Sequence, residues 1–309
     1  MSANTFELND AVRAQTPLQV GLVSPSGAGK TFSALRLATG IQRVTGGDIA
    51  VIDSEARRAL HYANKFKFKH MPFPAPFGPD AYLERIRYCH ERGARVIVID
   101  SASHEHSGTG GLLEMHADEW ERMGGQNKDK LSAWVKPKAA HQRMVNGIVQ
   151  LNCNFIWCFR AKEKMEVRPG QKPLDLGWMP IMSDDLVFEM TINCLLYPGS
   201  NGTPTWNSTM PGEQAIAKLP DQFRGLFKDS PQLTEDIGQA LAEWAQGAPV
   251  APALGAGELV VRFEACDTPA TLQQLETMRA ASWSSLSRDD QTRVKAASVA
   301  ASARITTRQ

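Results

Sequence analysis

The chain has 309 residues, of which 42% are hydrophobic and 22% are charged, and this is enough for one large α/β domain plus a smaller one. The formal net charge of +1 excludes a uniformly basic nucleic-acid-binding protein, so any contact with DNA or RNA must come from local patches. No apolar run approaches the length of a membrane span, the N-terminus lacks the features of a signal peptide, and the five cysteines contain no CxxC pair, so we expect a cytoplasmic protein with buried, reduced thiols and no membrane partner.

The first predicted strand, residues 18–23, leads into a glycine-rich loop and then into a helical pattern at residues 32–41. This order matches the P-loop pattern in its decisive Gly-Lys-Thr end. Successive backbone N–H groups of such a loop bind phosphate oxygens, and the positive end of the following helix assists them. We therefore expect ATP at this loop, in contact with Ser24, Pro25, Ser26, Gly27, Ala28, Gly29, Lys30, Thr31 and Phe32.

Two side chains of this loop have specific predicted roles. Lys30 would reach the β/γ-phosphates, and the Thr31 hydroxyl would hold Mg²⁺. The loop departs from the pattern at Ser24, where the first glycine is expected, and we interpret the small serine as a tolerated variant. A glycine turn before an ordinary helix is the alternative interpretation.

Two further predicted strands end at acidic side chains. Residues 48–53 form a buried strand that closes just before Glu55, and residues 94–100 form a β-branched strand that ends at Asp100. The second has the form of a Walker B motif, whose carboxylate orients Mg²⁺ or its bound water. The alternative is an aspartate that merely ends a strand. Between the two strands we expect a proline-rich surface connection at 71–79 and an amphipathic helix at 79–92.

The second half of the chain is predicted in less detail. We expect a loop-rich region at 101–130, a helix at 131–151, a fourth buried strand at 154–159, a mobile loop at 160–184, an edge hairpin with arms at 186–197 and 203–208, and a helix at 230–247. Small residues at 247–257 indicate a linker, which separates a core at 1–246 from a small helical C-terminal domain of two or three helices at 258–309.

The alternation of strands and helices predicts an α/β fold, with a mostly parallel sheet and helices on both of its faces. Ligands of such sheets bind beyond the carboxyl ends of the strands. Four candidate side chains fall at or just past predicted strand ends: Thr31, Glu55, Asp100 and Arg160. We therefore expect them to meet in one site.

Three segments, SPSGAGKT at 24–31, IAVIDSE at 49–55 and VIVIDSASH at 96–104, carry a resemblance to a known family. With them the chain resembles the RecA-like P-loop ATPases, and more narrowly the phage-encoded nucleotide-binding proteins linked to single-strand recombination. The similarity covers about residues 17–200 and leaves out the tail. It implies a RecA-like ATPase core, in which Glu55 polarises the attacking water and Asp100 is the Mg²⁺-associated acid. It also implies the cytoplasm of a bacterial host.

The resemblance leaves one role open. After the fourth strand the family places a polar sensor of the γ-phosphate, which is a glutamine in RecA, whereas Arg160, Ala161 and Lys162 stand there in this chain. One possibility is that Arg160 or Lys162 acts on nucleotide bound by a neighbouring subunit. Hydrolysis would then depend on assembly of a homo-oligomer, either a ring or a filament.

Two regions are candidates for contact with single-stranded DNA, because loops in these positions line a DNA channel in the family. The first, 120–143, combines cations with Trp120 and Trp134, and aromatic platforms among cations are how single strands are held. The second is 160–172. The candidate residues are Lys128, Lys130, Lys136, Lys138, Arg143, Lys164 and Arg168. Solvated surface, with the tryptophans partly in the core, is the alternative.

The function expected from the sequence is ATP hydrolysis by a protein that acts on single-stranded DNA in recombination, annealing or replication. One alternative is a P-loop phosphotransferase with its own acceptor pocket. Another is a nucleotide-switch or scaffold protein that recruits a DNA-processing partner through its C-terminal helices. Glu55 favours the first, whereas Ser24 and the unmatched sensor keep the switch open. His104, Glu105 and His106 lack the spacing of a zinc site and are interpreted as a polar loop.

Overall fold

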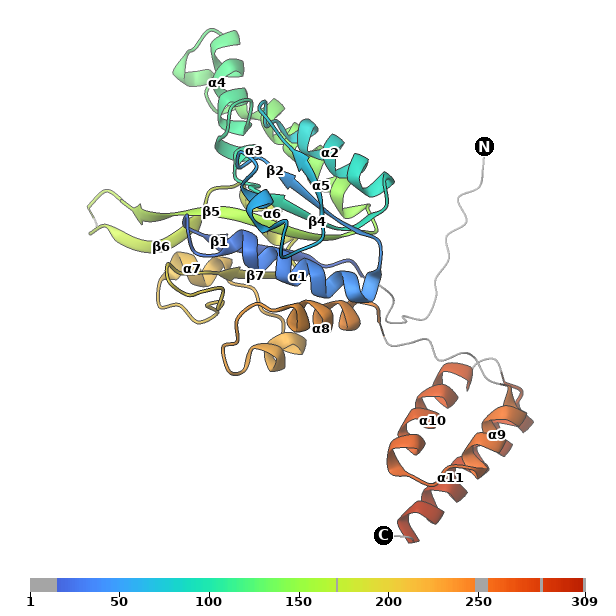
Figure 1. Ribbon diagram of the computed structural model, residues 1–309. Coiled ribbons are helices and arrows are strands. Elements are labelled where there is room, and N and C mark those ends of the chain that lie inside the picture. Colours follow the sequence, from blue (N-terminus) through green and yellow to red (C-terminus); the bar gives the residue numbers. More distant parts are fainter. Residues whose placement is uncertain (1–15, 171, 248–254, 284–285, 308–309) are drawn as a thin grey trace, which may run out of the picture. The chain divides into compact units, whose positions relative to one another are not determined.

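The computed structural model describes residues 16–170, 172–247, 255–283 and 286–307. Contacts divide the chain into two units, residues 15–246 and residues 247–309 together with 1–14 (Figure 1). The larger unit has the predicted α/β fold. Most of the predicted linker at 247–257 lies outside the described residues.

The larger unit is built on one seven-stranded sheet. The strands along its path run in the order β3-β2-β4-β5-β1-β7, and β6 pairs with β5 outside this path. Every pairing of named strands is parallel except β5 with β6. The strands are β1 (Gln19–Ser24), β2 (Asp48–Asp53), β3 (Lys69–Pro72), β4 (Ala94–Asp100), β5 (Asn154–Glu166), β6 (Leu174–Pro180) and β7 (Ile192–Leu195).

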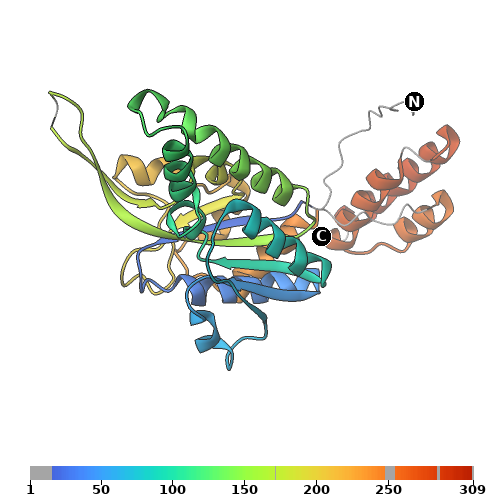
Figure 2. The same ribbon diagram turned by 90° about the horizontal axis from the view of Figure 1, so that it is seen from above.

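Helices cover both faces of the sheet, because alternate side chains of the buried strands point to opposite sides. On β5, Ile156 and Cys158 belong to the core beneath α1 (Lys30–Thr45) and α8 (Glu235–Ala245). The intervening aromatic residues of β5 belong to the core beneath α2 (Pro79–Glu91) and α5 (Val135–Val149). Figure 2 shows α1, in blue, and α5, in green, on opposite sides of the strands.

Shorter elements complete this unit. The remaining α-helices are α3 (His104–Ser107), α4 (Leu112–Arg122), α6 (Asp184–Phe188) and α7 (Pro211–Ile216). The 3₁₀ turns are η1 (Arg58–Tyr62), η2 (Asn127–Asp129), η3 (Ser132–Trp134) and η4 (Asp221–Phe227).

Several element predictions were wrong. The proline-rich surface connection begins inside a strand, β3, and the loop-rich region contains α3 and α4. The predicted edge hairpin was wrong: its first arm is α6 followed by β7, and among the described residues one isolated backbone bridge, Leu195–Thr205, joins it to the second arm. The last helix of the core begins at Glu235, where the Thr234 side chain caps it, and not at Pro231.

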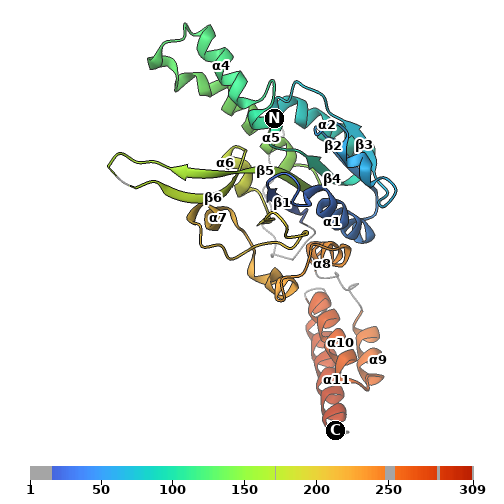
Figure 3. The same ribbon diagram turned by 60° about the vertical axis from the view of Figure 1, so that its left-hand side comes forward.

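The largest difference concerns residues 160–184, which were predicted as a mobile loop. Here β5 continues past the sheet to Glu166 and pairs antiparallel with β6. The β5–β6 hairpin projects beyond the rest of this unit (Figures 1 and 3). The described residues of the outer part of this hairpin are mostly exposed on both faces, so their sequence carries no hydrophobic period to detect.

A buried carboxylate fixes the base of this hairpin. Glu213 on α7 is 2% exposed and accepts hydrogen bonds from the Trp178 backbone N–H at 2.7 Å, from the Ser208 hydroxyl at 2.5 Å and from the Tyr197 hydroxyl. Gly177 lies beside it with φ 75°, and a Cβ there would be 2.4 Å from the Glu213 Oε1. Only glycine therefore fits at this point of β6.

The smaller unit contains three helices, α9 (Ala256–Glu264), α10 (Pro269–Ser282) and α11 (Arg288–Thr307), around an apolar core that includes Leu259 and Phe263. The predicted helix starts near Thr268 and Ser287 are confirmed. Among the described residues, no helix is both long and apolar enough to cross a membrane. All five cysteines of the chain are buried free thiols, as predicted.

Candidate functional site

The glycine loop lies at the carboxyl end of β1, between Ser24 and the first residue of α1. Gly27 and Gly29 have φ angles of 82° and 86°, in the left-handed region that favours glycine. A Cβ built at Gly27 meets no described atom within 4 Å, so this part of the loop is open. No described side chain caps the N-terminus of α1 at Gly29. The first N–H groups of the helix are therefore available to an anion.

The loop opens into a pocket of about 630 Å³, a volume within the usual range for small-molecule sites. Candidate residues from separate strand ends meet in it, as the sequence predicted. Its lining consists of Ser26, Gly27, Gly29, Lys30, Thr31, Glu55, Arg58, His61, Tyr62, Asp100, Arg160, Ala161 and Ile181. Ser24, Pro25, Ala28, Phe32 and Lys162 were also predicted at the site but are not part of this lining.

Ser24 stands where the P-loop pattern has a glycine, and its contacts with Lys30 show how the loop accommodates it. The Lys30 ammonium donates to the Ser24 carbonyl at 3.0 Å, to the Ser24 hydroxyl at 2.9 Å and to the Pro25 carbonyl at 3.1 Å. The serine side chain is fully buried and supplies one of these acceptors. Burial lowers the pKa of the Lys30 ammonium. The serine therefore orients Lys30 and leaves the pocket open.

Thr31 and Asp100 form the second polar contact of the pocket. The Thr31 hydroxyl donates to the Asp100 carboxylate at 2.5 Å, although β5 lies between β1 and β4 in the sheet. Asp100 is 3% exposed, and burial raises the pKa of its carboxyl to about 6, while the Thr31 hydrogen bond opposes this shift. A hydroxyl and a carboxylate at this separation fit the oxygen ligands that Mg²⁺ prefers.

Glu55 and Arg160 form an ion pair within one chain. The Arg160 Nε donates to the Glu55 Oε1 at 2.6 Å, and the Arg160 Nη2 donates to the Oε2 at 2.5 Å. Burial alone raises the pKa of the Glu55 carboxyl, but the hydrogen bond and charge of Arg160 outweigh it and hold that pKa below its usual value. Both side chains line the pocket of their own chain.

The sequence analysis missed η1, which supplies Arg58, His61 and Tyr62 to the pocket wall. Phe32, a predicted nucleotide contact, instead packs its ring on Tyr62 at 5.6 Å between ring centroids, and on Phe66. It therefore supports the aromatic wall from behind. One sequence feature could have indicated this turn: an aromatic residue, Tyr62, follows shortly after a strand that ends in acidic side chains.

The candidate DNA-binding region at 120–143 forms an arm around α4 and the start of α5, which projects from the sheet (Figures 1 and 3). Three of its cations are paired: Arg122 and Lys136 with Glu119, at 2.6 and 3.0 Å, and Arg143 with Asp80 at 3.0 Å. Both tryptophans are half-buried. Trp134 stacks on His116, and Trp120 donates to the Gln126 carbonyl and lies under the Lys130 ammonium. Lys128 and Lys138 are exposed on the same arm.

The second candidate region lies on the β5–β6 hairpin. Lys162 and Lys164 are exposed, whereas Arg168 pairs with Glu166 at 2.8 Å. Because side chains alternate along a strand, Arg160, Lys162 and Lys164 share one face of the hairpin. We call these three residues the cationic face, and its first member lies in the pocket.

In the histidine-rich segment after Asp100, His104 and Glu105 have hydrogen-bond partners within the chain. The His104 ring pairs with the Ser54 hydroxyl at 2.8 Å, and Glu105 pairs with His141 at 2.8 Å in the core. The described residues contain no group of three or more histidine, cysteine or carboxylate side chains that could hold a metal ion. This segment was predicted as a polar loop, whereas residues His104–Ser107 form the short helix α3.

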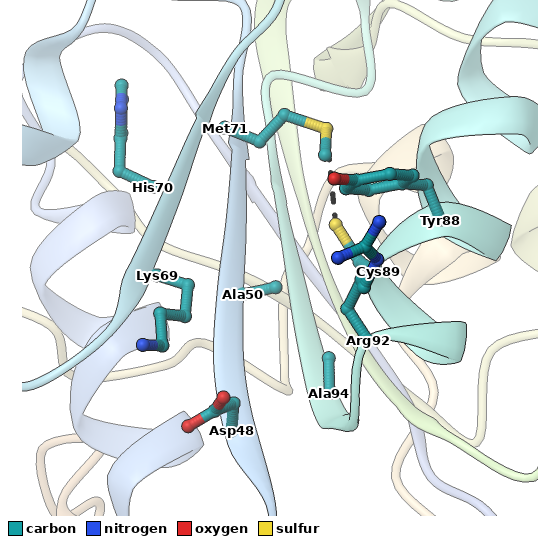
Figure 4. Close-up of a pocket in the computed structure, with 9 residues that line it drawn as sticks. All are labelled: Asp48, Ala50, Lys69, His70, Met71, Tyr88, Cys89, Arg92 and Ala94. Atoms are coloured by element: carbon teal, nitrogen blue, oxygen red, sulfur yellow. Dashed lines mark hydrogen bonds between the residues drawn. The ribbon is translucent and has the colours of Figure 1, made fainter.

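A second cavity, of about 150 Å³, lies at the opposite ends of the strands (Figure 4). Asp48, Lys69 and Ala94, the first residues of β2, β3 and β4, form part of its lining, with Met71 and Cys89. It has no glycine loop and is small for a nucleotide. The pocket at the carboxyl ends is therefore the candidate site.

No known protein family matches this sequence, and no curated protein matches it. The fold, the geometry of the pocket and the sequence motifs are therefore what bears on function.

Proposed function

We propose that this protein is a RecA-like, Mg²⁺-dependent ATPase. The observation that supports this most directly is the convergence of Lys30, Thr31, Asp100 and Glu55 on one pocket beside an open glycine loop. The loop and the N-terminus of α1 supply N–H donors for phosphate oxygens. The choice of ATP and of the RecA-like class rests on the sequence resemblance.

Each of these side chains has its own role in phosphoryl transfer. Lys30 exchanges the loop oxygens it now contacts for oxygens of the β- and γ-phosphates. Thr31 and Asp100 would hold Mg²⁺, which would neutralise charge on the phosphates. Glu55 accepts a hydrogen bond from a water molecule and aligns it with the γ-phosphorus. The bond to the ADP oxygen breaks as the bond to water forms, which yields ADP and inorganic phosphate.

The aromatic wall of the pocket offers a place for the base. Tyr62 and His61 line the pocket beside the glycine loop, and Phe32 supports Tyr62 from the far side. Aromatic side chains stack readily on nucleobases. We assign Tyr62 as the main stacking surface.

Steady-state ATP hydrolysis tests this proposal. We expect turnover that needs Mg²⁺ and stops when the metal is chelated. Single-stranded DNA should stimulate it increasingly as protein concentration rises, if subunits assemble on the strand into a ring or filament. ATP binding without turnover under any condition would instead support the nucleotide switch, in which the C-terminal helices recruit a recombination or replication partner. The ion pair that holds Glu55 is the observation that favours this second candidate.

Single-stranded DNA is the proposed macromolecular partner, and the cationic face is its best-supported contact. Lys162 and Lys164 have no ion-pair partner within the part of the chain that the structure describes. On the arm, acidic neighbours already pair with Lys136 and Arg143. A phosphate backbone along the hairpin would also lead directly to Arg160 in the nucleotide pocket.

The double variant Lys162→Glu/Lys164→Glu is expected to weaken single-strand binding and to reduce its salt dependence. Each lost phosphate contact lowers the slope of log K against log salt by about 0.7, so the pair should lower it by about 1.4. The matched control is Lys67→Glu/Lys69→Glu, two exposed lysines with the same spacing just before and at the start of the edge strand β3. Fluorescence anisotropy over a salt series measures both. An unchanged slope in the hairpin variant would move the DNA site to Lys128, Lys130 and Lys138 on the arm.

A further inference from the structure

The ion pair between Glu55 and Arg160 occupies the Glu55 carboxylate, which the proposed mechanism uses to align the attacking water. Each Glu55 oxygen accepts a guanidinium N–H at 2.6 or 2.5 Å, and Arg58 lies 3.5 Å from the Oε2. We propose that Arg160 is an internal latch on Glu55, and that the γ-phosphate of a bound triphosphate opens it by taking Arg160 over. This inference rests on the ATPase proposed above and adds its regulation.

The latch weakens Glu55 in two ways. A bidentate guanidinium neutralises the carboxylate and fixes its orientation. It also makes the carboxylate a poorer proton acceptor, because the pKa of Glu55 lies below its usual value. While the pair persists, Glu55 is a weak acceptor for a water molecule. A pocket in this arrangement binds nucleotide without efficient hydrolysis.

Arg160 is the partner that can move. Its side chain is 43% exposed, whereas that of Glu55 is 10% exposed. The Arg160 backbone is fixed on both sides: its N–H donates to the Ser103 hydroxyl at 2.8 Å, and its carbonyl accepts from the Ile181 N–H at 2.8 Å. The guanidinium can therefore change partners about a fixed backbone.

The γ-phosphate is a suitable competitor for the guanidinium. A planar guanidinium binds phosphate in the same bidentate manner as carboxylate. The terminal phosphate of a triphosphate carries more charge than a single carboxylate, and Lys30 in the same pocket would hold it nearby. A diphosphate lacks this group and would leave the ion pair intact. The latch would thus distinguish ATP from ADP.

The same geometry assigns Arg160 to the nucleotide of its own chain. The sequence left open an action of Arg160 on a neighbouring subunit. In the structure its side chain lines the same pocket as Lys30 and Thr31 of its own chain. Lys162, two residues further along the same face, lies outside that lining and remains available to DNA.

A binding cycle tests the latch without relying on turnover. The affinities of ADP and of a slowly hydrolysed triphosphate, ATPγS, are measured with Mg²⁺ for the wild type, Glu55→Gln, Arg160→Ala and the double variant. Glu55→Gln should bind ATPγS about tenfold more tightly, because Arg160 no longer has to leave a carboxylate. Arg160→Ala should weaken ATPγS binding about ten- to hundredfold. Neither change should alter ADP binding by more than about twofold, because the diphosphate lacks the group that Arg160 binds.

The double variant decides between a latch and two independent effects. The tightening caused by Glu55→Gln should disappear once Arg160 is alanine. If it persists, or if Arg160→Ala weakens ADP as much as ATPγS, the latch is wrong while nucleotide binding still stands. A wild type that binds neither nucleotide would overturn the ATPase proposal itself. The pair Arg36–Glu235, at 2.8 Å and outside the pocket, supplies the matched controls Arg36→Ala and Glu235→Gln.

Mixing two variants tests whether Arg160 acts in its own chain. Lys30→Ala lacks the phosphate-binding lysine but keeps the guanidinium, and Arg160→Ala keeps the lysine but lacks the guanidinium. If Arg160 served a neighbour, Lys30→Ala subunits would supply it to Arg160→Ala sites, and those sites would bind ATPγS as tightly as the wild type. We expect no such tightening at any ratio, and its appearance would overturn the assignment. Thermal unfolding of each variant shows that the fold is retained.

Discussion

Lys30→Ala is expected to reduce ATP hydrolysis at least about a hundredfold, the loss typical when a preorganised donor to the transition state is removed. The Lys30 ammonium is held beside the glycine loop by contacts with Ser24 and Pro25. Phosphate oxygens bound by the loop would face this cation. Alanine removes that charge and also leaves the loop oxygens without their donor, so ATP binding should weaken as well.

The effect is measured as turnover and as nucleotide affinity on the same preparations. Lys67→Ala is the matched control, because Lys67 is exposed and lies outside the pocket. Circular dichroism of both variants separates a lost site from a lost fold. Full activity in Lys30→Ala would remove the glycine loop from the mechanism, whereas lost binding in the control as well would point to a general charge effect.

The buried strands could be predicted from the sequence because both of their faces are covered. Residues 49–52 and 96–99 are continuous apolar runs, and the structure places β2 and β4 over them. The edge strand β3 and the β5–β6 hairpin lack that signal, because exposed strands mix charged and apolar side chains. Predictions therefore failed at the edge strand β3 and at the exposed extension of β5, and not at the buried strands.

The helix α4 was missed for a different reason. Glycines at Gly110 and Gly111 before it, and at Gly124 after it, made the whole region look loop-rich. Gly111 is in fact the N-cap of α4, and Gly124 follows its C-terminus with φ 100°. These glycines mark the ends of a helix, where such residues are common.

In the candidate site, too, some features could be predicted from the sequence and others could not. Lys30, Thr31 and Asp100 could be placed from local motifs, since each stands at a fixed distance from a strand end. The contact between Glu55 and Arg160 depends on how β5 lies between β1 and β4, with Arg160 opposite Ser24. No local sequence pattern specifies which residues of neighbouring strands lie opposite each other. The sequence thus indicated the members of the site and not the ion pair that holds Glu55.

Glu55→Gln is expected to lower the rate of ATP hydrolysis by about a hundred- to a thousandfold while ATP binding is retained. Glutamine keeps the size of the side chain but cannot carry the negative charge that aligns water and accepts its proton. The phosphate-binding loop, Lys30 and the Thr31–Asp100 pair are untouched by this change. A loss confined to turnover would therefore locate the defect in the chemical step.

The control for this variant must break a comparable ion pair without touching the pocket. Glu235→Gln does so, because Glu235 contacts Arg36 at 2.8 Å and neither residue lines the pocket. Single-turnover hydrolysis at saturating ATP measures both variants. Normal turnover in Glu55→Gln would remove Glu55 from the chemistry and would favour the nucleotide switch. A slow Glu55→Gln beside a normal Glu235→Gln would make Glu55 the residue that converts nucleotide binding into hydrolysis.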